Sequence, residues 1–392
     1  SDLMGEMPVG RLIFHMSWPA VLSMFIQAFY NVVDSFFVSM ISEQALAAVT
    51  YIFPVQMLII SVAVGTGVGI NSLIARRLGA QRYEEADLAA SHGYRISFFN
   101  WMFFALIGIF LSGPMMHMMS DTPYIVENGE KYMFIITVGS LFSIIQITSE
   151  KILQSTGNMK IPMICSIAGA ATNIILDPMF IFGVGPFPEM GVTGAAVATI
   201  MGQFVSMCLG QYFLFAKEHA VNVRLRGWKV QGRILRDIYA VGAPAILMQS
   251  ITSVMQFGMN VILGNLTETA VAVMGVYGRL QSFIFMPVFG LNQGVLPVMG
   301  FNYGARNRKR LMEAYKKGVF TALVIMGIGL ILFQTIPHQL LAIFNSTGNQ
   351  AMYDIGVPAL KTISLCFLPA AFGIMTSSIF QAIGHGFLSL WG

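Results

Sequence analysis

The sequence predicts an all-α polytopic membrane protein with two pseudo-symmetric helical lobes, the first with six helices and the second with about four. Three observations predict this fold class: the composition, the recurrence of long apolar runs and an internal repeat. Of the 392 residues, 56% are hydrophobic and 10% are charged. That balance leaves too little polar surface to cover a water-soluble globule of this length, so the chain is expected in a lipid bilayer.

Apolar runs that could cross about 30 Å of hydrocarbon as a helix recur about ten times. They are expected near Leu12–Ile41, Ala47–Ala75, Ile96–Met116, Tyr132–Ile152, Ile161–Phe182, Gly194–Phe215, Ile238–Leu263, Ala270–Gly300, Val319–Ile336 and Gly356–Ala382. The first run is too long for the apolar region of a cleavable signal peptide and lacks a convincing cleavage site. We therefore expect it to be a membrane span.

The internal repeat covers the first two spans of each lobe. A shift of about 225 residues superimposes Pro19–Ala80 on Pro244–Ala305 without a gap, with about thirteen identities. The identities include Pro19/Pro244, Gly65/Gly290, Gly69/Gly294 and Gly79/Gly304. An even number of spans separates the copies, so they insert in the same direction, as in transporters whose halves are related by an axis along the membrane normal.

The cations predict the orientation, because positive charges resist translocation and collect in short cytoplasmic loops. The clusters are Arg76, Arg77, Arg82, Arg95; Lys151, Lys160; Lys217, Arg224, Arg226, Lys229, Arg233, Arg236; and Arg306, Arg308, Lys309, Arg310, Lys316, Lys317. All of them fall on one face if the N-terminus is cytoplasmic. Topology explains these charges without a nucleic-acid partner, and we expect none.

The longest basic loop divides the chain. The expected organisation is a six-helix lobe over residues 1–216, a cytoplasmic linker over 217–236 and a second lobe over 237–392. A weaker match pairs Gln154 and Gly157 with Gln381 and Gly384, after which the first half continues for two more spans and the second does not. We therefore expect that the last two helices of a twelve-helix design are missing, through a truncation, a gene fragment or a frameshift.

Two acids lie inside predicted spans of the first lobe. Asp34 is in the first span and Asp177 is in the fifth, and both fall in the outer half by helical rise. An unpaired carboxylate in hydrocarbon costs several kcal/mol, so such residues are rare and usually functional. Only the first repeat carries a buried acid at this position, because no acid occupies the matching place in the second.

Each acid has polar neighbours at helical spacing. Gln27, Tyr30 and Asn31 precede Asp34 by seven, four and three residues, and Asn173 precedes Asp177 by four. Pro19 is placed to bend the first span and Pro178 to disturb the fifth, which can expose backbone carbonyls to a cation. In the second lobe Arg279 and Lys361 lie inside spans, where charges usually face an aqueous cavity, although interfacial snorkelling also explains them.

Burial disfavours the charged form of a carboxyl group, and a second carboxylate nearby disfavours it further. A pair of such groups titrates as a unit. It can hold a proton or admit a cation in its place, which is the minimum machinery for antiport. The alternative is that each acid is a structural hydrogen-bonding group, permanently protonated or paired.

Over essentially its whole length the chain resembles the multidrug and toxic compound extrusion (MATE) family, part of a superfamily that also exports lipid-linked precursors. The resemblance rests on Pro19, Tyr30-Asn31 to Asp34, Arg77-Leu78-Gly79-Ala80, Gln154 to Gly157-Asn158, Asn173 to Asp177-Pro178, and Gly191 to Ala196. It implies two six-helix lobes in an inverted V that rock between outward-open and inward-open states. It also implies that drugs or organic cations are expelled from a bacterial inner membrane in exchange for protons or sodium.

Carried across by resemblance, the cation-coupling residues are Asp34, Asn173 and Asp177, and any sodium ion would bind there. The bending proline is Pro19, and the sixth-helix hydroxyl is Thr193 or Thr199. Gln27, Tyr30, Asn31, Thr193, Thr199 and Arg279 are candidates for the substrate cavity. One branch of the family uses acids in the seventh and tenth helices, whereas here Met248–Leu263 has none and Asp354 is expected before the tenth helix. This departure favours the DinF-like branch.

Other signatures carry no chemistry. The run Gly65-Thr66-Gly67-Val68-Gly69 lacks the preceding strand that a nucleotide loop needs. The three cysteines and six histidines have no disulfide or metal-ligand spacing. With no Walker motif and no hydrolase or transferase constellation, we expect neither an enzyme nor a cofactor beyond H⁺ or Na⁺.

Three hypotheses remain. The first is a monomeric secondary antiporter that exports amphipathic or cationic small molecules in exchange for H⁺ or Na⁺. The second is a lipid-linked precursor flippase, which should have a strongly cationic central cavity for pyrophosphate. The third is a non-transporting fragment, which would show no substrate-dependent flux.

Overall fold

In the computed structural model, residues 2–216, 221, 223, 230–343, 345 and 348–391 are described, and all regular structure in them is helical. The first half contains α1 (Asp2–Glu6), α2 (Val9–Ser39), α3 (Glu43–Gly79), α4 (Tyr83–Met119), α5 (Pro123–Val138), α6 (Ser140–Ser155), α7 (Lys160–Phe182) and α8 (Val192–Ala216). The second contains α9 (Gly232–Gly264), α10 (Glu268–Gly304), α11 (Arg308–Thr335), α12 (Pro337–Ala342), α13 (Gln350–Ile363), the 3-10 turn η1 (Ser364–Cys366), α14 (Phe367–Ala382) and α15 (Gly386–Trp391).

Within the described residues, 10 helical segments are long and apolar enough to cross a membrane, which confirms the predicted all-α membrane fold. In the linker predicted at 217–236, residues 217–220, 222 and 224–229 lie outside the described part of the chain. Residues 232–236 form the first turn of α9, so this helix begins within the predicted linker.

Two predicted spans are not single helices. The span expected at Tyr132–Ile152 consists of α5 and α6, which meet at Gly139. A Cβ atom at Gly139 would lie 2.6 Å from Ile200 of α8, so the glycine allows α8 to approach the break. Trp101 Nε1 donates to the carbonyl of Val138, 2.7 Å away, and satisfies an acceptor that the break frees. The span expected at Gly356–Ala382 is likewise divided, into α13, η1 and α14.

Several helices extend beyond their apolar runs. α4 begins at Tyr83 rather than near Ile96. The prediction was based on apolar residues alone and therefore left out the charged first turns of this helix. α3 and α10 start at equivalent caps, where Ser42 Oγ accepts from Ala45 N at 3.0 Å and Thr267 Oγ1 accepts from Ala270 N at 3.2 Å. The repeat therefore extends to the local chemistry that begins these helices.

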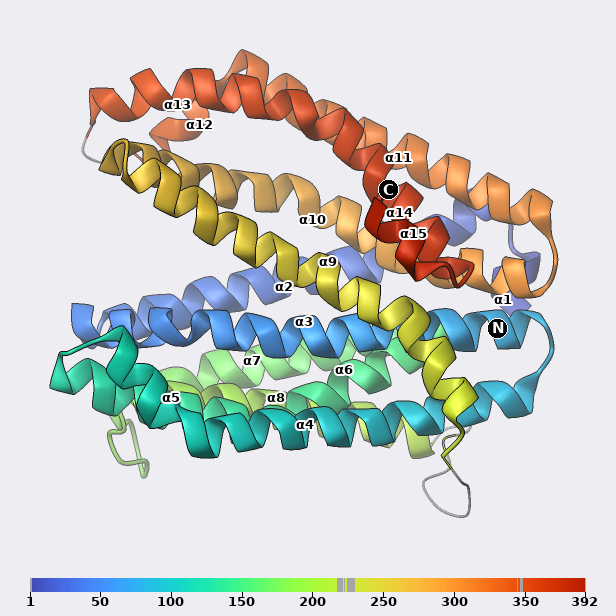
Figure 1. Cartoon of the computed structure of the whole chain (residues 1–392), viewed down its shortest axis with the longest axis horizontal. Helices are drawn as coiled ribbons and strands as arrows, with labels where there is room; N and C mark the ends of the chain where they lie inside the picture. The colour runs from blue at the N-terminus through green and yellow to red at the C-terminus, as the bar shows by residue number, and fades with distance from the viewer. Residues whose placement is uncertain are drawn as a thin grey trace.

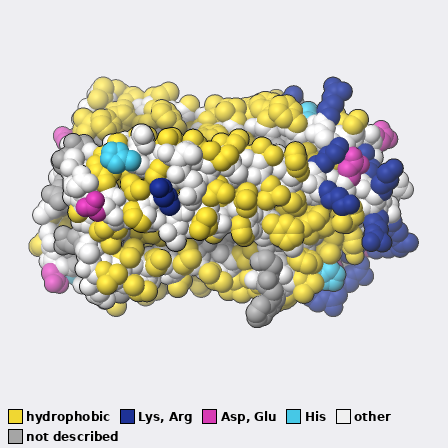
Figure 2. All heavy atoms as spheres, turned by 90° about the horizontal axis from the view of Figure 1, so that it is seen from above, with side chains coloured by type: hydrophobic (Ala, Val, Ile, Leu, Met, Phe, Trp, Pro, Cys, Tyr) yellow, Lys and Arg dark blue, Asp and Glu magenta, His cyan; other side chains and the backbone are white. Residues whose placement is uncertain are grey.

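The helices run roughly along the long axis of the molecule (Figure 1). In this view α3–α8 occupy the lower part, α10–α13 the upper part, and α9 runs diagonally between them. Lysines and arginines gather at the end where the α3–α4 and α10–α11 turns lie (Figure 2). This end is called the basic face below. A broad yellow surface covers the middle of the molecule, as expected for side chains that meet lipid.

The two halves meet near the basic face along a seam with repeat symmetry. Gly65 of α3 packs against Ile246 of α9, and the equivalent Gly290 of α10 packs against Val21 of α2. A Cβ atom at Gly65 would lie 2.8 Å from Ile246 Cα, and one at Gly290 would lie 2.8 Å from Val21 Cα. Since a shift of about 225 residues converts one contact into the other, the seam is isologous, like the interface of a two-fold dimer.

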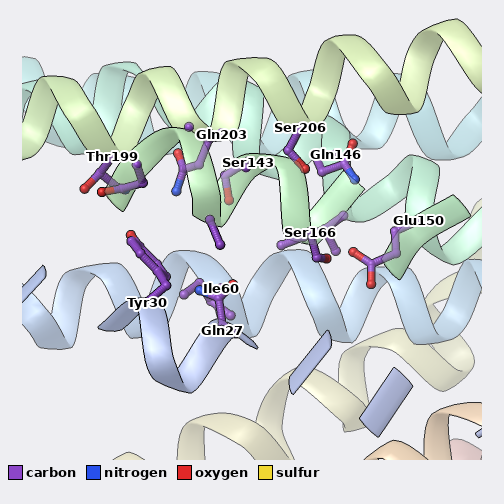
Figure 3. Close-up of a pocket in the computed structure, with 15 residues that line it drawn as sticks. Gln27, Tyr30, Ile60, Ser143, Gln146, Glu150, Ser166, Thr199, Gln203 and Ser206 are labelled. Carbon is purple, nitrogen blue, oxygen red and sulfur yellow. The ribbon is translucent and has the colours of Figure 1, made fainter. Parts of the chain in front are cut away.

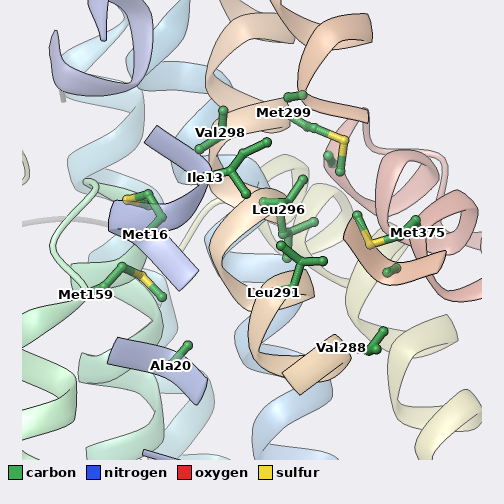
Figure 4. Packing of buried hydrophobic residues seen from close by; sticks show 14 of the residues in the cluster. Ile13, Met16, Ala20, Met159, Val288, Leu291, Leu296, Val298, Met299 and Met375 are labelled. Carbon is green, nitrogen blue, oxygen red and sulfur yellow. The ribbon is translucent and has the colours of Figure 1, made fainter. Parts of the chain in front are cut away.

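Buried apolar side chains close the seam. One continuous cluster joins residues of α2 and α3 to residues of α9, α10, α11 and α14. Figure 4 shows part of it, with Ile13 of α2 beside Val298 and Leu296 of α10, and Met16 on the side of α2 that faces Met159. A second cluster lies within the first half alone and includes Val38, Phe104 and Tyr132. The halves therefore share a core toward the basic face.

Candidate functional site

Two helices of the first half bring the predicted acids together. Asp34 on α2 and Asp177 on α7 have carboxyl groups within hydrogen-bonding reach of each other. Asp177 is fully buried and Asp34 is partly buried. A hydrogen bond between two carboxyl groups requires a proton on one of them. The pair therefore has the geometry to share one proton, a point that sequence alone left open.

Asn173 and Tyr30 extend the network from the same two helices. With its amide oriented by its hydrogen-bond partners, Asn173 donates to Asp177 Oδ2 at 3.1 Å and accepts from the Tyr30 hydroxyl at 3.2 Å. Tyr30 also makes a side-chain hydrogen bond with Thr199 of α8. Asp34 is four residues after Tyr30 and Asp177 four after Asn173, so helical spacing sets both acids beside their partners.

A cavity of about 230 Å³ lies beside this network. Figure 3 shows Tyr30 and Thr199 at one end and Glu150 of α6 at the other, with Gln203, Gln146 and Ser166 between them. Sites for drug-sized ligands usually measure about 300–1,000 Å³. The cavity is thus suited to ions and water, and a larger substrate needs a different space.

Acceptor oxygens outnumber donors around the network. Among the described residues, Asp34 Oδ1, Gln203 Oε1 and Gln146 Oε1 are buried and have no hydrogen-bond partner. Asp34 belongs to the acid pair, and the two glutamines line the cavity. Unpaired buried acceptors are costly, and a proton or a hard cation with oxygen ligands would relieve that cost. These unpaired oxygen atoms therefore fit H⁺ or Na⁺ as a ligand. In the described chain, no three His, Cys, Asp or Glu side chains form a metal cluster.

The remaining predicted residues are placed unequally. Gln27 and Thr199 line the cavity with Tyr30 and Asn173, whereas Asn31 is exposed and does not line it. Thr193 lies in a separate cavity with Glu127 and Glu130. Thr199 is thus the hydroxyl that joins the acid network, while Thr193 does not reach it. Arg279 is exposed on α10 and lines neither cavity.

Both predicted prolines lie inside the helices that carry the acids. Pro19 lies in α2 between the seam contact at Ser17 and Asp34, and Pro178 directly follows Asp177 in α7. A proline removes the amide hydrogen that would bond the carbonyl four residues earlier. Each acid helix therefore has a free backbone acceptor and a weak point, without a break in its helical assignment.

Sequence reasoning missed a pair of adjacent charged residues inside a membrane segment, of which Lys151 is buried and Glu150 is half-buried. Glu150 and Lys151 lie in α6, and Lys151 is 6% exposed. Lys151 was grouped with the loop cations, which is wrong, because its stem packs against Gly67 of α3, where a Cβ atom would lie 2.6 Å from Lys151 Cγ. Gln154 bridges the pair, since its Oε1 accepts from Lys151 at 3.4 Å and its amide donates to Glu150 at 3.3 Å. The adjacent acid and base inside an apolar run were the available signal.

Two further residues near the acids were also missed. Tyr132 of α5 is 1% exposed, interacts electrostatically with Asp34, Asp177 and Tyr30, and hydrogen-bonds to Gln56 of α3. Neither residue stands at helical spacing from an acid, so only the packing of α3 and α5 against α2 and α7 places them here.

The position expected for Asp354 needs correction. α13 begins at Gln350, so Asp354 lies in the first turns of the tenth membrane segment rather than before it. The Asn349 side chain caps this helix by accepting from Ala351 N at 3.0 Å, which extends it beyond the apolar run. Asp354 is exposed and accepts from Gln350 at 3.2 Å, so it remains at the end of the span.

These features define a helical membrane transporter with duplicated halves and an acid pair buried in one of them. The MatE family pattern matches residues 19–179 and again 244–390. The two matches begin at Pro19 and Pro244, the first residues of the aligned repeat. The chain belongs to the MatE family, whose members are transporters and not enzymes.

Characterised relatives and solved structures agree with this assignment. A FAD transporter of Shewanella oneidensis is 26% identical over 369 residues, which cover 93% of this chain and 79% of that protein. Multidrug export protein MepA of Staphylococcus aureus is 25% identical over 387 residues, with 97% and 83% covered. An outward-facing multidrug resistance MATE transporter of the MOP superfamily superposes with a TM-score of 0.92 at 30% identity, covering 100% of this chain and 86% of that one.

A further solved structure shows that binding-pocket polarity differs among related transporters. It is a MOP superfamily transporter from Pyrococcus furiosus with a TM-score of 0.91 and 30% identity, covering 99% of this chain and 86% of that one. The reverse polarity of the binding pocket in that protein suggests a different function for it. Membership of the family therefore establishes a multi-pass transporter of small molecules, and substrate polarity has to be argued from each chain.

Proposed function

We propose that this protein is a secondary multidrug antiporter that exports amphipathic or cationic small molecules in exchange for H⁺ or Na⁺. The observation that carries the proposal is the contact between Asp34 and Asp177, supported by Asn173 and Tyr30. The relatives that are named as multidrug exporters support the substrate class. The basic face is assigned to the cytoplasm by the positive-inside rule, which places the N-terminus there in a bacterial plasma membrane.

The coupling ion acts on the acid pair. When the pair shares a proton, Asp34 and Asp177 attract each other through a hydrogen bond, and when both are ionised they repel. Entry of a cation removes that repulsion. The position of α2 against α7 is therefore sensitive to whether an ion is bound.

α2 connects this event to the seam between the halves. The same helix carries Asp34 in its C-terminal part and, nearer its start, Ser17 and Val21, which pack on Gly294 and Gly290 of α10. Pro19 lies within the seam contact and weakens the helix there. We infer that ion binding at Asp34 changes the packing of α2 on α10, so that the ion-bound and substrate-bound forms favour different states of the seam.

Substrate is proposed to bind between the halves. The cavity beside the acids is too small for a drug-sized molecule, and the exposed residues Asn31 on α2 and Thr252 and Gln256 on α9 offer polar groups outside it. A space bounded by both halves would be exposed to opposite sides of the membrane as the seam closes or opens.

The test is gradient-driven transport by the purified chain in proteoliposomes. A fluorescent organic cation is followed under an imposed pH gradient, then under a sodium gradient, for the wild type and for Asp34→Asn. The matched control is Asp354→Asn, because Asp354 is an exposed acid at the end of a span. Flux that depends on one gradient and is lost only in Asp34→Asn supports the proposal and identifies the ion.

Unchanged flux in Asp34→Asn would refute coupling through the acid pair. The flippase hypothesis is tested by offering a lipid-linked pyrophosphate in the same vesicles, and the fragment hypothesis predicts no flux of either molecule. In the described chain, no cluster of cations lines the first-half cavity, which gives the flippase no support there.

A further inference from the structure

A second cavity, of about 650 Å³, opens on the basic face. It is formed by the ends of α3 and α10, the start of α11 and the end of α14, so both halves of the protein contribute walls. Its volume lies within the range of sites that hold small-molecule ligands. Five arginines line it and no acid does: Arg76, Arg77, Arg82, Arg306 and Arg308.

The nearby acids balance only part of this charge. Glu85 pairs with Arg77 at 3.0 Å and with Arg82 at 3.7 Å, and Asp237 pairs with Arg77 at 3.6 Å. Glu85 also pairs with Arg233, outside the cavity, at 3.3 Å. In the described chain, no carboxylate lies within ion-pairing distance of the other three arginines: Arg76, Arg306 and Arg308.

The helix ends around the cavity reduce the positive charge without cancelling it. α3, α10 and α14 all end at this face, and a helix C-terminus is equivalent to about half a negative charge. Against five guanidinium groups and two carboxylates, this contribution leaves an excess of positive charge. The cavity is therefore complementary to an anion.

Arg76 is held in place rather than free in solvent. Its Nε donates to the carbonyl of Ser72 at 3.3 Å, and its guanidinium packs against Gly384, where a Cβ atom would lie 2.6 Å from one terminal nitrogen. Gly384 has φ +90°, so the turn after α14 needs a glycine at this contact. The positive-inside rule accounts for cations in exposed loops, but it does not require a half-buried arginine fixed in a cavity wall.

The arginines come from opposite sides of the seam. Arg76, Arg77 and Arg82 belong to the α3–α4 region of the first half, and Arg306 and Arg308 to the α10–α11 region of the second. Like charges that face each other across the seam repel, which disfavours the closed arrangement. An anion bound between them would be attracted to both halves.

We propose that this cavity binds a phosphate-bearing anion and that the bound anion holds the basic ends of the two halves together. Arginine suits this ligand, because its planar fork donates paired hydrogen bonds to phosphate oxygens. The ligand is either the headgroup of an anionic phospholipid or a soluble phosphate compound. Binding stabilises the state in which the basic face is closed, in addition to any effect of the coupling ion.

The test measures anion binding and seam geometry in the purified full chain. Nanodiscs of phosphatidylcholine are compared with discs that contain phosphatidylglycerol, and with phosphatidylcholine discs to which inorganic pyrophosphate is added. Retained lipid is counted by native mass spectrometry, and pyrophosphate binding is measured by calorimetry. Spin labels at Tyr83 and Lys316, on the basic ends of the first and second halves, report the separation of the halves.

The test variant is Arg306→Gln/Arg308→Gln, and the control is Arg11→Gln/Lys309→Gln, which removes the same charge from exposed residues outside the cavity. Because charge-assisted hydrogen bonds are lost, the test variant should bind the anion at least about tenfold more weakly. The control should bind as the wild type does. Anion should shorten the label distance in the wild type and in the control only.

The two arms identify the source of the ligand. A response to phosphatidylglycerol alone assigns a lipid headgroup, and a response to pyrophosphate alone assigns a soluble compound. Equal binding by the test variant and the wild type would overturn the proposal, as would equal weakening in the control. Binding with no change in label distance would overturn the claim that the anion holds the halves together. None of these readouts depends on transport.

Discussion

Gly79 of α3 and Gly304 of α10 occupy equivalent positions in the two repeats, and each lies against the backbone of the other's helix. A Cβ atom at Gly79 would collide with the carbonyl oxygen of Phe301, and one at Gly304 with the carbonyl oxygen of Arg76. Phe301 is the repeat equivalent of Arg76, so the two contacts exchange under the same shift of about 225 residues. The halves therefore meet backbone to backbone here, through a pair of symmetric glycines.

Replacement of either glycine by alanine should force α3 and α10 apart at the basic face. Because the obstacle is backbone and cannot rotate away, Gly304→Ala should destabilise the closed arrangement by about 1–3 kcal/mol. The spin-label distance across the basic face should lengthen, and the melting temperature in detergent should fall. The control is Gly275→Ala on the same helix, which has nothing within 4 Å. An unchanged distance in Gly304→Ala would contradict the closed seam.

The internal repeat allowed part of the contact between the halves to be predicted from the sequence. Gly65, Gly69 and Gly79 recur as Gly290, Gly294 and Gly304, and all six lie on the seam. At all six positions the absence of a side chain lets two helix backbones approach closely, which is the usual reason for a small residue between membrane helices. The sequence could not show that α3 contacts α9 while α10 contacts α2, because a linear match carries no information on which helices face each other.

The candidate site was predictable in part. Helical spacing correctly associated Tyr30 with Asp34 and Asn173 with Asp177, since neighbours on one helix face follow from geometry. Contacts between helices, such as Tyr30 with Thr199, depend on packing that spacing does not determine. Lys151 was misplaced because a count of cations treats every lysine near a loop as exposed. Its burial depends on the packing of α6 against Gly67 of α3.

Tyr30→Phe tests whether the hydroxyl positions Asn173. The substitution keeps the aromatic ring and removes the hydroxyl group that hydrogen-bonds to Asn173 and Thr199. If the hydroxyl orients the amide that serves Asp177, the ion concentration that gives half-maximal flux should rise about tenfold while maximal flux changes less. Proteoliposome flux measured against ion concentration separates the two quantities. Tyr124→Phe, at an exposed position on α5, is the control and should match the wild type.

Asp177→Asn should uncouple flux from the ion gradient without unfolding the protein. Asparagine has the size and hydrogen-bonding capacity of a protonated aspartic acid, so the buried contacts with Asn173 and Asp34 can persist. Loss of the charge removes the repulsion between ionised carboxylates that ion binding is proposed to relieve. The melting temperature should stay near the wild-type value, and substrate should equilibrate instead of accumulating. Accumulation at the wild-type level would contradict the role proposed for the pair.

The buried pair in α6 yields a prediction about stability. Removal of the amine in Lys151→Ala leaves the half-buried Glu150 without its neighbouring cation and takes away the stem that packs on Gly67. Removing one member of a fully buried charge pair commonly costs about 3–5 kcal/mol, and the half-buried position of Glu150 puts the expected loss below that range, so the melting temperature in detergent should fall measurably. Lys160→Ala, an exposed lysine at the start of α7, should leave it unchanged.

The double variant Glu150→Gln/Lys151→Met separates charge pairing from packing. It removes both charges and keeps a long side chain against Gly67, so most of the stability lost in Lys151→Ala should return. Recovery would show that the protein is destabilised when one charge of the pair is removed alone, and not when both charges are removed together. If the double variant is as unstable as the single one, the bond network through Gln154 matters more than charge balance, and Gln154→Leu should then reproduce the defect.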